Sequence, residues 1–266
     1  MDLGLRDRGC LITGGSRGIG LQVAKQLIAE GANVLLLGRG EAALAEAARE
    51  CESAGSGRAD WLALDITRAG AADQAVQVCR ERFGRVDVLV NNASRSVTRS
   101  LEELADEDWQ GDWEINVMAP MRLMRAAVPE MAERGWGRVV NVSSSSGKRP
   151  GQRNVAYSVT KAAELSLSRA YADFYAPRGV RINAVTPGPV ASELWLEPGG
   201  LADQTAQARG ITRKEVLEST AAGLPVRRLA GPEEIASVIV FLCSERASNV
   251  AGAAWSVDGG AVPVIL

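Results

Sequence analysis

The segment Thr13-Gly14-Gly15-Ser16-Arg17-Gly18-Ile19-Gly20 stands between a short apolar run and the start of a helical pattern. Glycines in this context allow a tight turn after a strand and let backbone N–H groups approach a pyrophosphate. The N-terminus of the following helix adds about half a positive charge. The alternative, a glycine-rich connection without a ligand, is disfavoured because strand, turn and helix are in register. The turn therefore predicts a dinucleotide site, with cofactor-binding residues Gly14, Ser16, Arg17, Gly18, Ile19 and Gly20.

Outside this turn, β-branched or leucine-rich runs alternate with longer alanine-rich stretches, which indicates a parallel sheet with crossover helices. The runs are nearly continuously hydrophobic, as in strands covered on both faces. We expect an α/β fold: a single doubly wound Rossmann-type domain over residues 1–266, with a parallel seven-stranded sheet flanked by helices. The expected strands are Cys10 to Thr13, Asn33 to Leu37, Trp61 to Leu64, Val86 to Val90, Arg138 to Val142, Arg181 to Val185 and Ala254 to Val257. The expected helices are Gly18 to Glu30, Glu41 to Ala54, Ala69 to Phe83, Trp113 to Arg134, Tyr157 to Tyr175 and Glu233 to Ser244.

One segment, from about residue 187 to 223, interrupts this alternation with polar, weakly periodic sequence. A long interruption in a compact domain is usually functional. We interpret it as a lid over the substrate, with Trp195 as a substrate-contacting residue; a surface insertion is the alternative.

The composition excludes several classes of function. The net charge of −2 provides no field for nucleic acid or an anionic membrane, so neither is expected as a partner. The chain has no histidine, which removes Ser-His-Asp and Cys-His catalysis and most zinc sites, and we expect no metal. The four cysteines form no CxxC pair and indicate buried thiols of a reducing compartment. No run reaches signal-peptide length or the ~20 residues of a membrane span, so we expect a cytoplasmic protein.

The residues after the second expected strand indicate whether the dinucleotide carries a 2′-phosphate. Dinucleotide folds that bind the ribose hydroxyls commonly place an acidic residue about twenty positions after the glycines. This chain has Leu37-Gly38-Arg39 there, with no carboxylate to repel a 2′-phosphate. Arg39 and Arg17 together can supply charge-assisted bonds to that phosphate, although either arginine alone is more typical of a solvated loop. NADP(H) is therefore favoured over NAD(H).

A serine, a tyrosine and a lysine supply candidate chemistry. Ser144 ends a strand, and Tyr157 and Lys161 share one face of an expected helix. A tyrosine hydroxyl ordinarily has a pKa near 10, and a neighbouring ammonium favours the phenolate, as a general acid/base requires. Ser144 can hold a substrate carbonyl oxygen by a hydrogen bond. Each feature alone is more often structural; their joint occurrence after a dinucleotide turn favours catalysis.

At this point the chain closely resembles the short-chain dehydrogenase/reductase family, in its single-domain form, over practically its whole length. The motifs that carry the resemblance are the TGGSRGIG turn, Asp65-Ile66, Asn91-Asn92-Ala93, Asn116, Ser144 with Tyr157 and Lys161, Pro187-Gly188, and Val257-Asp258-Gly259-Gly260. The resemblance implies that Tyr157 gives a proton to the substrate oxygen, Lys161 assists it and binds the nicotinamide ribose, and Ser144 orients the carbonyl. It also implies that Asn116 helps to hold a relay water. The further cofactor contacts that it implies are Asp65, Ile66, Asn91, Asn92, Pro187, Gly188, Val190 and Ser192.

Two departures concern the substrate side. Ser94 stands where the family usually has glycine, and its side chain can crowd the nicotinamide ribose or narrow the substrate entrance. Lys148, Arg149 and Arg153 lie between Ser144 and Tyr157, which hints at a carboxylate or phosphate on the substrate; a solvated basic loop is the equal alternative. We take Ser94, Arg149 and Arg153 as substrate residues.

The leading hypothesis is reduction of a small-molecule ketone to a secondary alcohol with NADPH, as in reductases of 3-oxoacyl thioesters and related carbonyl compounds. The alternatives are an NAD-dependent sugar or polyol dehydrogenase, and a cofactor-sensing module without catalysis. The resemblance also implies a homo-oligomer, a tetramer or dimer, paired through the long helices.

Overall fold

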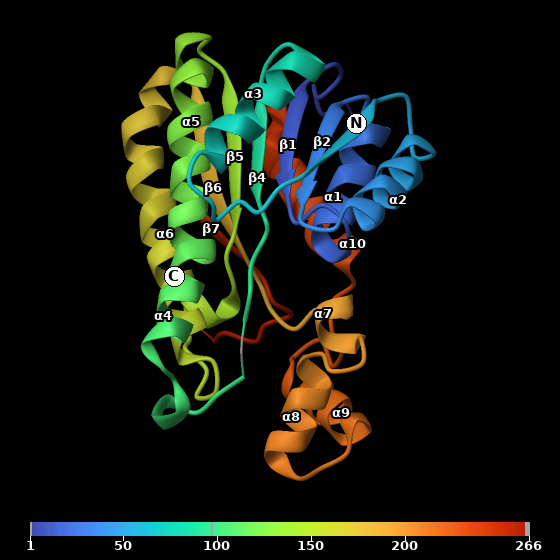
Figure 1. Ribbon diagram of the computed structural model, residues 1–266, viewed down its shortest axis with the longest axis vertical. Helices are drawn as coiled ribbons and strands as arrows, with labels where there is room; N and C mark the ends of the chain where they lie inside the picture. The colour runs from blue at the N-terminus through green and yellow to red at the C-terminus, as the bar shows by residue number, and fades with distance from the viewer. Residues whose placement is uncertain (1, 97, 264–266) are drawn as a thin grey trace.

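The computed structural model describes residues 2–96 and 98–263, and its centre is a sheet of seven parallel strands (Figure 1). The strand order β3-β2-β1-β4-β5-β6-β7 reverses direction between β1 and β4, which makes the doubly wound topology. The bounds are β1 (Gly9–Thr13), β2 (Asn33–Gly38), β3 (Ala59–Ala63), β4 (Val88–Asn91), β5 (Gly137–Val142), β6 (Val180–Pro187) and β7 (Ala254–Val257). The predicted fold class is confirmed.

Helices cover both faces of this sheet. Successive strand residues point to opposite faces, so in β1 Cys10 and Ile12 join one hydrophobic cluster and Leu11 joins the other. The helices on the first face are α1 (Gly18–Ala29), α2 (Glu41–Glu52) and α10 (Pro232–Cys243). Those on the second are α3 (Ala71–Phe83), α5 (Ala119–Glu133) and α6 (Val155–Tyr175). Burial on both faces explains the nearly unbroken apolar runs of the strands.

The helix expected over Trp113 to Arg134 is wrong in both its start and its regularity. Helical structure begins earlier, with α4 (Asp106–Trp113), passes through a π-helical turn, η2 (Glu114–Met118), and continues as α5. Pro120 has no N–H to donate to the carbonyl four residues earlier, that of Asn116, so regular α-helix bonding is broken there. The irregular turn thus lies at Asn116, a predicted catalytic residue.

Between β6 and α10 the chain forms three helices that stand apart from the sheet (Figure 1). They are α7 (Glu193–Leu196), α8 (Leu201–Arg209) and α9 (Arg213–Gly223). Only Ala202, Ala206 and Val216 are buried within them. Because few of their side chains enter the core, their sequence has the weak periodicity noted above.

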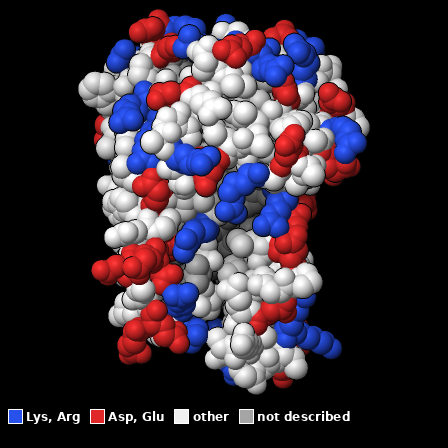
Figure 2. All heavy atoms as spheres, in the orientation of Figure 1, with Lys and Arg blue, Asp and Glu red and all other residues white. Residues whose placement is uncertain are grey.

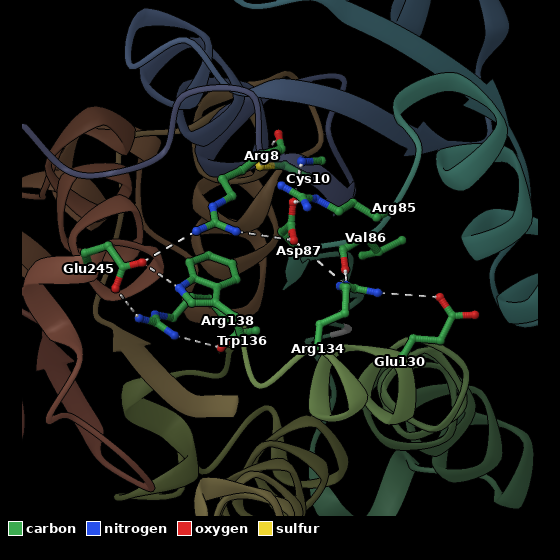
Figure 3. Close-up of polar contacts among 12 residues, drawn as sticks. Arg8, Cys10, Arg85, Val86, Asp87, Glu130, Arg134, Trp136, Arg138 and Glu245 are labelled. Carbon is green, nitrogen blue, oxygen red and sulfur yellow. Dashed lines mark hydrogen bonds and ion pairs between the residues drawn. The ribbon is translucent and has the colours of Figure 1, made fainter. Parts of the chain in front are cut away.

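The amino ends of the strands carry a network of charged residues (Figure 3). Asp87, 1% exposed, accepts from Arg85 Nε at 2.8 Å and from the Gly9 N–H at 3.1 Å, and lies 3.6 Å from an Arg8 nitrogen. Glu245 accepts from Arg138 at 3.2 Å. Arg8 also stacks on the Trp136 ring, 3.6 Å from its centroid. Ion pairs therefore cover the amino ends of these strands.

No helix in residues 2–96 and 98–263 combines the length and apolarity needed to cross a membrane. The four cysteines, Cys10, Cys51, Cys79 and Cys243, are buried free thiols. Burial raises the pKa of Cys51 to about 11 and that of Cys79 to about 12. Their packing role agrees with the sequence interpretation.

Candidate active site

The candidate site lies at the carboxyl ends of the strands, opposite the charged network. β1 and β4 lie next to each other where the strand order reverses, and this point of a doubly wound sheet is where ligands bind. Thr13 ends β1, and the glycine turn leads from it directly into α1.

The turn has a backbone that only glycine fits well. Gly14 has φ +65°, in the left-handed region. A Cβ on Gly20 would lie 2.2 Å from the Gly14 carbonyl oxygen, so α1 packs against the turn at backbone distance. Arg17 is the N-cap of α1, and no side chain caps the helix there. The first N–H groups of α1 are thus left for an external acceptor, as a pyrophosphate requires.

Two asparagines at the carboxyl end of β4 make different contacts. Asn92 Nδ2 donates to the carbonyls of Thr13 (2.9 Å) and Gly14 (3.1 Å), while Thr13 Oγ1 accepts from the backbone N–H of Asn92 (2.9 Å). Asn92 therefore holds the glycine turn against the end of β4. Asn91 is buried and donates to Asn141 Oδ1 at 2.8 Å, which ties β4 to β5. Its side-chain nitrogen is engaged within the sheet.

The residues for the adenosine end lie after β2 and β3. Arg39 is exposed and follows β2 directly. Asp65 follows β3 closely and accepts from Thr67 Oγ1 (2.7 Å) and from the Thr67 N–H (3.0 Å). These hydrogen bonds, helped by the charges of Arg39 and Arg68, lower the pKa of Asp65. Ile66 is mostly buried in the second core cluster. The guanidinium of Arg39 has no carboxylate partner among the described residues.

Tyr157 and Lys161 lie one turn apart in α6, beside the end of β5. Lys161 is 1% exposed, and its Nζ lies 5.8 Å from the centroid of the Tyr157 ring. Lys161 Nζ donates to the Val142 carbonyl at 2.8 Å, which anchors it to β5. Ser144, two residues after Val142, caps a 3₁₀ turn by accepting from the Ser146 N–H at 3.1 Å. The carboxyl end of β5 and one face of α6 thus bring the three predicted residues to the same end of the sheet.

Asn116 is fully buried and joins several parts of the site. Its Nδ2 donates to Thr160 Oγ1 at 3.0 Å, and Thr160 Oγ1 donates in turn to the Tyr157 carbonyl at 2.8 Å. Its Oδ1 accepts from Ser94 Oγ at 2.8 Å. The departure at Ser94 therefore adds a hydrogen bond to Asn116, in addition to any effect of its bulk on the entrance.

The sequence interpretation missed Glu164. Its carboxylate is buried and accepts from Lys161 Nζ at 2.8 Å. Glu164 follows Lys161 by three residues, and both belong to the buried residues of α6, whereas Tyr157 is half-buried. That spacing was the available signal. Burial raises the pKa of Glu164 to about 7, against the opposing charge of Lys161.

The start of the segment after β6 contacts the glycine turn. Val190 is buried and pairs with Ala230 in an isolated bridge. Ser192 and Glu193 follow, with Glu193 Oε2 only 3.2 Å from the position of a Cβ on Gly18. Glu197 accepts from Arg17 at 2.7 Å. Residues Pro187 and Gly188 lie beside β7, and a Cβ on Gly188 would be 2.8 Å from the Asp258 carbonyl oxygen.

A cavity of about 410 Å³ lies between the loop that precedes α6 and the helices α7 and α8. Figure 2 shows the molecule hollowed between its main body and these outer helices, with Lys and Arg side chains along the rim. Arg153 and Trp195, both predicted substrate residues, line the cavity, as do Asn154 and Arg209. Arg153 also lines a neighbouring cavity of about 490 Å³, together with Glu103 and Gln207.

Two basic residues of the loop before α6 are placed differently. Lys148 donates to the Ala254 carbonyl (2.7 Å) and to Ser256 Oγ (2.9 Å), so it serves the link to β7. Arg149 is exposed and lines neither of these two cavities. Among the three basic residues of this loop, Arg153 alone lines the two cavities. Arg209 was not predicted from the sequence, because it belongs to the distant helix α8.

Comparison with known proteins agrees with this geometry. The family model described as short chain dehydrogenase matches residues 8–198. The chain belongs to the short-chain dehydrogenase family. The resemblance stated from the sequence motifs is thereby confirmed. In this family context, the bare N-terminus of α1 and the glycine backbone fit a nicotinamide dinucleotide.

Individual members of the family show what it contains. The chain is 34% identical over 262 residues to a D-beta-hydroxybutyrate dehydrogenase of Cupriavidus necator, covering 96% of this chain and 98% of that one. It is 32% identical to a 3-oxoacyl-[acyl-carrier-protein] reductase of Thermotoga maritima, with 97% and 99% covered. The structure of L-sorbose reductase from Gluconobacter frateurii, complexed with NADPH and L-sorbose, matches with a TM-score of 0.93 and 37% identity over the whole of both chains. The family is thus an oxidoreductase family that includes ketone reductases.

Proposed function

We propose that this short-chain dehydrogenase reduces a ketone to a secondary alcohol with NADPH, with the reverse oxidation possible. The observation that carries the proposal is the placement of Tyr157 and Lys161 on one face of α6, beside the end of β5 that bears Ser144. This group lies at the same edge of the sheet as the glycine turn, so a bound dinucleotide and a carbonyl can meet there.

Each residue then has a distinct role. When bound, the dihydronicotinamide supplies the hydride. Tyr157 gives its proton to the substrate oxygen, and Ser144 donates a hydrogen bond to the same oxygen as charge develops on it. Lys161 supports the tyrosine and binds the nicotinamide ribose. Asn116, fixed by Thr160 and Ser94, helps to hold a relay water.

The preference for NADP(H) rests on Arg39 and Arg17. Arg39 follows β2 at the place where an acidic residue would bind ribose hydroxyls, and it is exposed and without a carboxylate partner among the described residues. A 2′-phosphate would supply that partner. Similar proteins with NADP(H) bound support the choice: the L-sorbose reductase and a 3-oxoacyl reductase of Agrobacterium tumefaciens, 32% identical with a TM-score of 0.86.

We propose the segment 187–223 as the lid, because its helices α7 and α8 form one wall of a cavity whose other lining includes residues 151–154, just before α6. Arg153 and Arg209 line this cavity, and neither has an ion-pair partner among the described residues. Such walls suit a polar or anionic ketone, such as a short 3-oxo acid or a keto sugar, better than a long acyl chain. The similarity to the L-sorbose reductase favours the keto sugar as a second candidate beside the 3-oxoacyl type.

The test is NADPH and NADH oxidation by the purified protein against 3-oxoacyl thioesters, 3-oxo acids and their esters, cyclic diketones and keto sugars. Turnover with NADPH on one class establishes the reaction and its substrate class. If NADPH binds but no ketone is reduced, the non-catalytic sensor is favoured instead. Oxidation of a polyol by NAD⁺, or reduction of a keto sugar by NADH but not by NADPH, would support the sugar or polyol dehydrogenase.

The cavity arginines give a sharper test of the substrate. If the substrate is anionic, Arg153→Gln and Arg209→Gln should raise KM for an acid about tenfold and leave KM for its ester unchanged. Arg149→Gln, outside both cavities, is the matched control. Equal effects on acid and ester would assign the two arginines to the fold of the cavity wall.

We also propose a homo-oligomer. Trp113 of α4 is 44% exposed, and Val159 and Phe174 of α6 are 43% and 66% exposed. α4 and α6 pack side by side, so these apolar side chains lie on neighbouring helices that can pair with a second copy. Light scattering of the purified protein tests this, and Phe174→Glu should yield the monomer.

A further inference from the structure

Tyr157, Lys161 and Glu164 recur at helical spacing along α6, and Glu164 has no part in the roles assigned above. The side chains of Lys161 and Glu164 are each only 1% exposed. A buried carboxylate is costly unless it is paired, and the single charged partner of Glu164 among residues 2–96 and 98–263 is Lys161, at 2.8 Å. Lys161 therefore compensates the buried charge of Glu164.

The hydrogen-bond capacity of Lys161 is limited. Its ammonium has three N–H donors. One goes to the Val142 carbonyl of β5 and one to Glu164 Oε2, both at 2.8 Å. Only one donor remains for a cofactor hydroxyl or for Tyr157. Glu164 and Val142 together fix the direction of that third N–H.

The pair also changes the charge that Tyr157 experiences. Lys161 Nζ is 5.8 Å from the centroid of the Tyr157 ring, and a lone ammonium beside a tyrosine favours the phenolate. A carboxylate 2.8 Å from the same ammonium opposes that effect.

We propose that Glu164 is a positioning residue for the reaction: it fixes the Lys161 ammonium beside Tyr157 and offsets its charge, so that Tyr157 remains a proton donor to higher pH. The proposal rests on the proposed reductase activity. It favours the reduction direction, in which Tyr157 must begin protonated.

Apart from the exposed Asp106, Glu107 and Arg178, the other charged groups on elements packed against α6 have partners of their own. Asp112 of α4 also senses the charge of Lys161, and it is paired with Arg95 at 2.9 Å. The remaining pairs are Asp108 with Arg99, Glu114 with Arg122 and Arg138 with Glu245, while Arg181 donates to the carbonyls of Ala176 and Ser248. Glu164 is thus the group among the described residues that directly balances Lys161.

The experiment compares pH profiles of NADPH oxidation at saturating ketone for the wild type, Glu164→Gln, Glu164→Asp and Ser168→Ala. In Glu164→Gln the alkaline limb should move to lower pH by about one unit or more. The Lys161 ammonium is then no longer offset, so Tyr157 loses its own proton more readily. A limb that stays in place or moves to higher pH would contradict the proposal.

Two variants serve as controls. Glu164→Asp keeps the charge but shortens the reach, so kcat should fall several-fold while the limb stays in place; this prediction also stands if the Gln variant does not fold. Ser168→Ala changes a buried polar residue one turn further along α6, without a hydrogen-bond partner in the described part of the chain, and should leave the profile unchanged. A shifted limb in Glu164→Asp would overturn the proposal.

NADPH binding, followed by fluorescence over the same pH range, gives a readout independent of turnover. Affinity in Glu164→Gln should begin to fall at lower pH than in the wild type. A uniform loss of rate at every pH, with an unmoved binding profile, would reduce Glu164 to a purely structural residue. If the wild type reduces no ketone, the proposed function fails, but the binding profile still decides the relation of Glu164 to Lys161.

Discussion

Arg17, the N-cap of α1, donates to Glu197 at 2.7 Å, so a residue of the dinucleotide turn is tied to the end of α7. The same arginine is proposed to bind the 2′-phosphate of NADPH. The carboxylate and the phosphate therefore compete for one guanidinium, and cofactor binding is coupled to the position of the segment 187–223.

This competition predicts that Glu197→Gln binds NADPH more tightly and leaves NADH binding unchanged. Both side chains are more than half exposed, and such pairs contribute about 0–1 kcal/mol, so the gain should be no more than about fivefold. Fluorescence titration measures it. Glu218→Gln, which removes an exposed partner of Lys214 in α9, is the control. An equal gain for NADH would place Arg17 at the pyrophosphate instead of the 2′-phosphate.

Arg39→Asp should weaken NADPH binding by about two orders of magnitude or more and change NADH binding little. The substitution replaces a charge-assisted donor by a carboxylate that repels the 2′-phosphate and can accept from ribose hydroxyls. Arg68→Asp is the matched control, because Arg68 also lies near Asp65 and changes the local charge equally. Loss of both cofactors to the same extent would show that Arg39 does not contact the 2′-phosphate.

Tyr157→Phe should lower kcat by at least about a thousandfold with NADPH affinity nearly unchanged, because only the transferable proton is lost. Steady-state rates and fluorescence titration separate the two quantities. Tyr175→Phe, at the end of the same helix, should retain full activity. A Tyr157→Phe enzyme that works at a near-normal rate would assign proton transfer to another group.

The burial of Glu164 predicts a pH dependence of stability in the cofactor-free protein. Burial raises its pKa from 4.5 to about 7, so the folded state holds this proton more firmly than the unfolded chain does. Ionisation of Glu164 therefore costs stability as pH rises from about 4.5 to about 7, by up to about 3 kcal/mol. The Glu164→Gln side chain does not ionise, so the variant does not lose this stability. The free energy of unfolding of the variant minus that of the wild type should therefore increase from about pH 4.5 to about pH 7, as denaturant titrations at several pH values would show. A difference that does not change with pH contradicts the expectation.

The architecture was predictable because burial on both faces of a parallel sheet leaves apolar runs that are visible in sequence. The bounds of β7 were predicted to the residue, as Ala254–Val257. The long helix was harder, because the effect of Pro120 on the carbonyl of Asn116 depends on which turn that residue enters. The three helices of the segment 187–223 bury too few side chains to give a periodic signal.

The site was predictable only in part, for a physical reason. The glycine turn, Ser144, Tyr157 and Lys161 are defined by chemistry and local spacing. Arg209 and Glu197 reach their positions through tertiary packing, so no local pattern marks them. Glu164 was missed because a glutamate within a helix ordinarily faces solvent. Its partner lies only three residues away, but its burial depends on β5, whose residues are distant in sequence.

The paired charges of Asp87 and Glu245 lie at the amino ends of the strands, whereas the proposed catalytic residues lie at the carboxyl ends. The part of the molecule that secures the scaffold is therefore physically separate from the proposed substrate site. Natural selection or laboratory evolution can vary the cavity walls around Arg153 and Arg209 while the fold keeps its anchorage. This separation makes the scaffold tolerant of new substrate preferences.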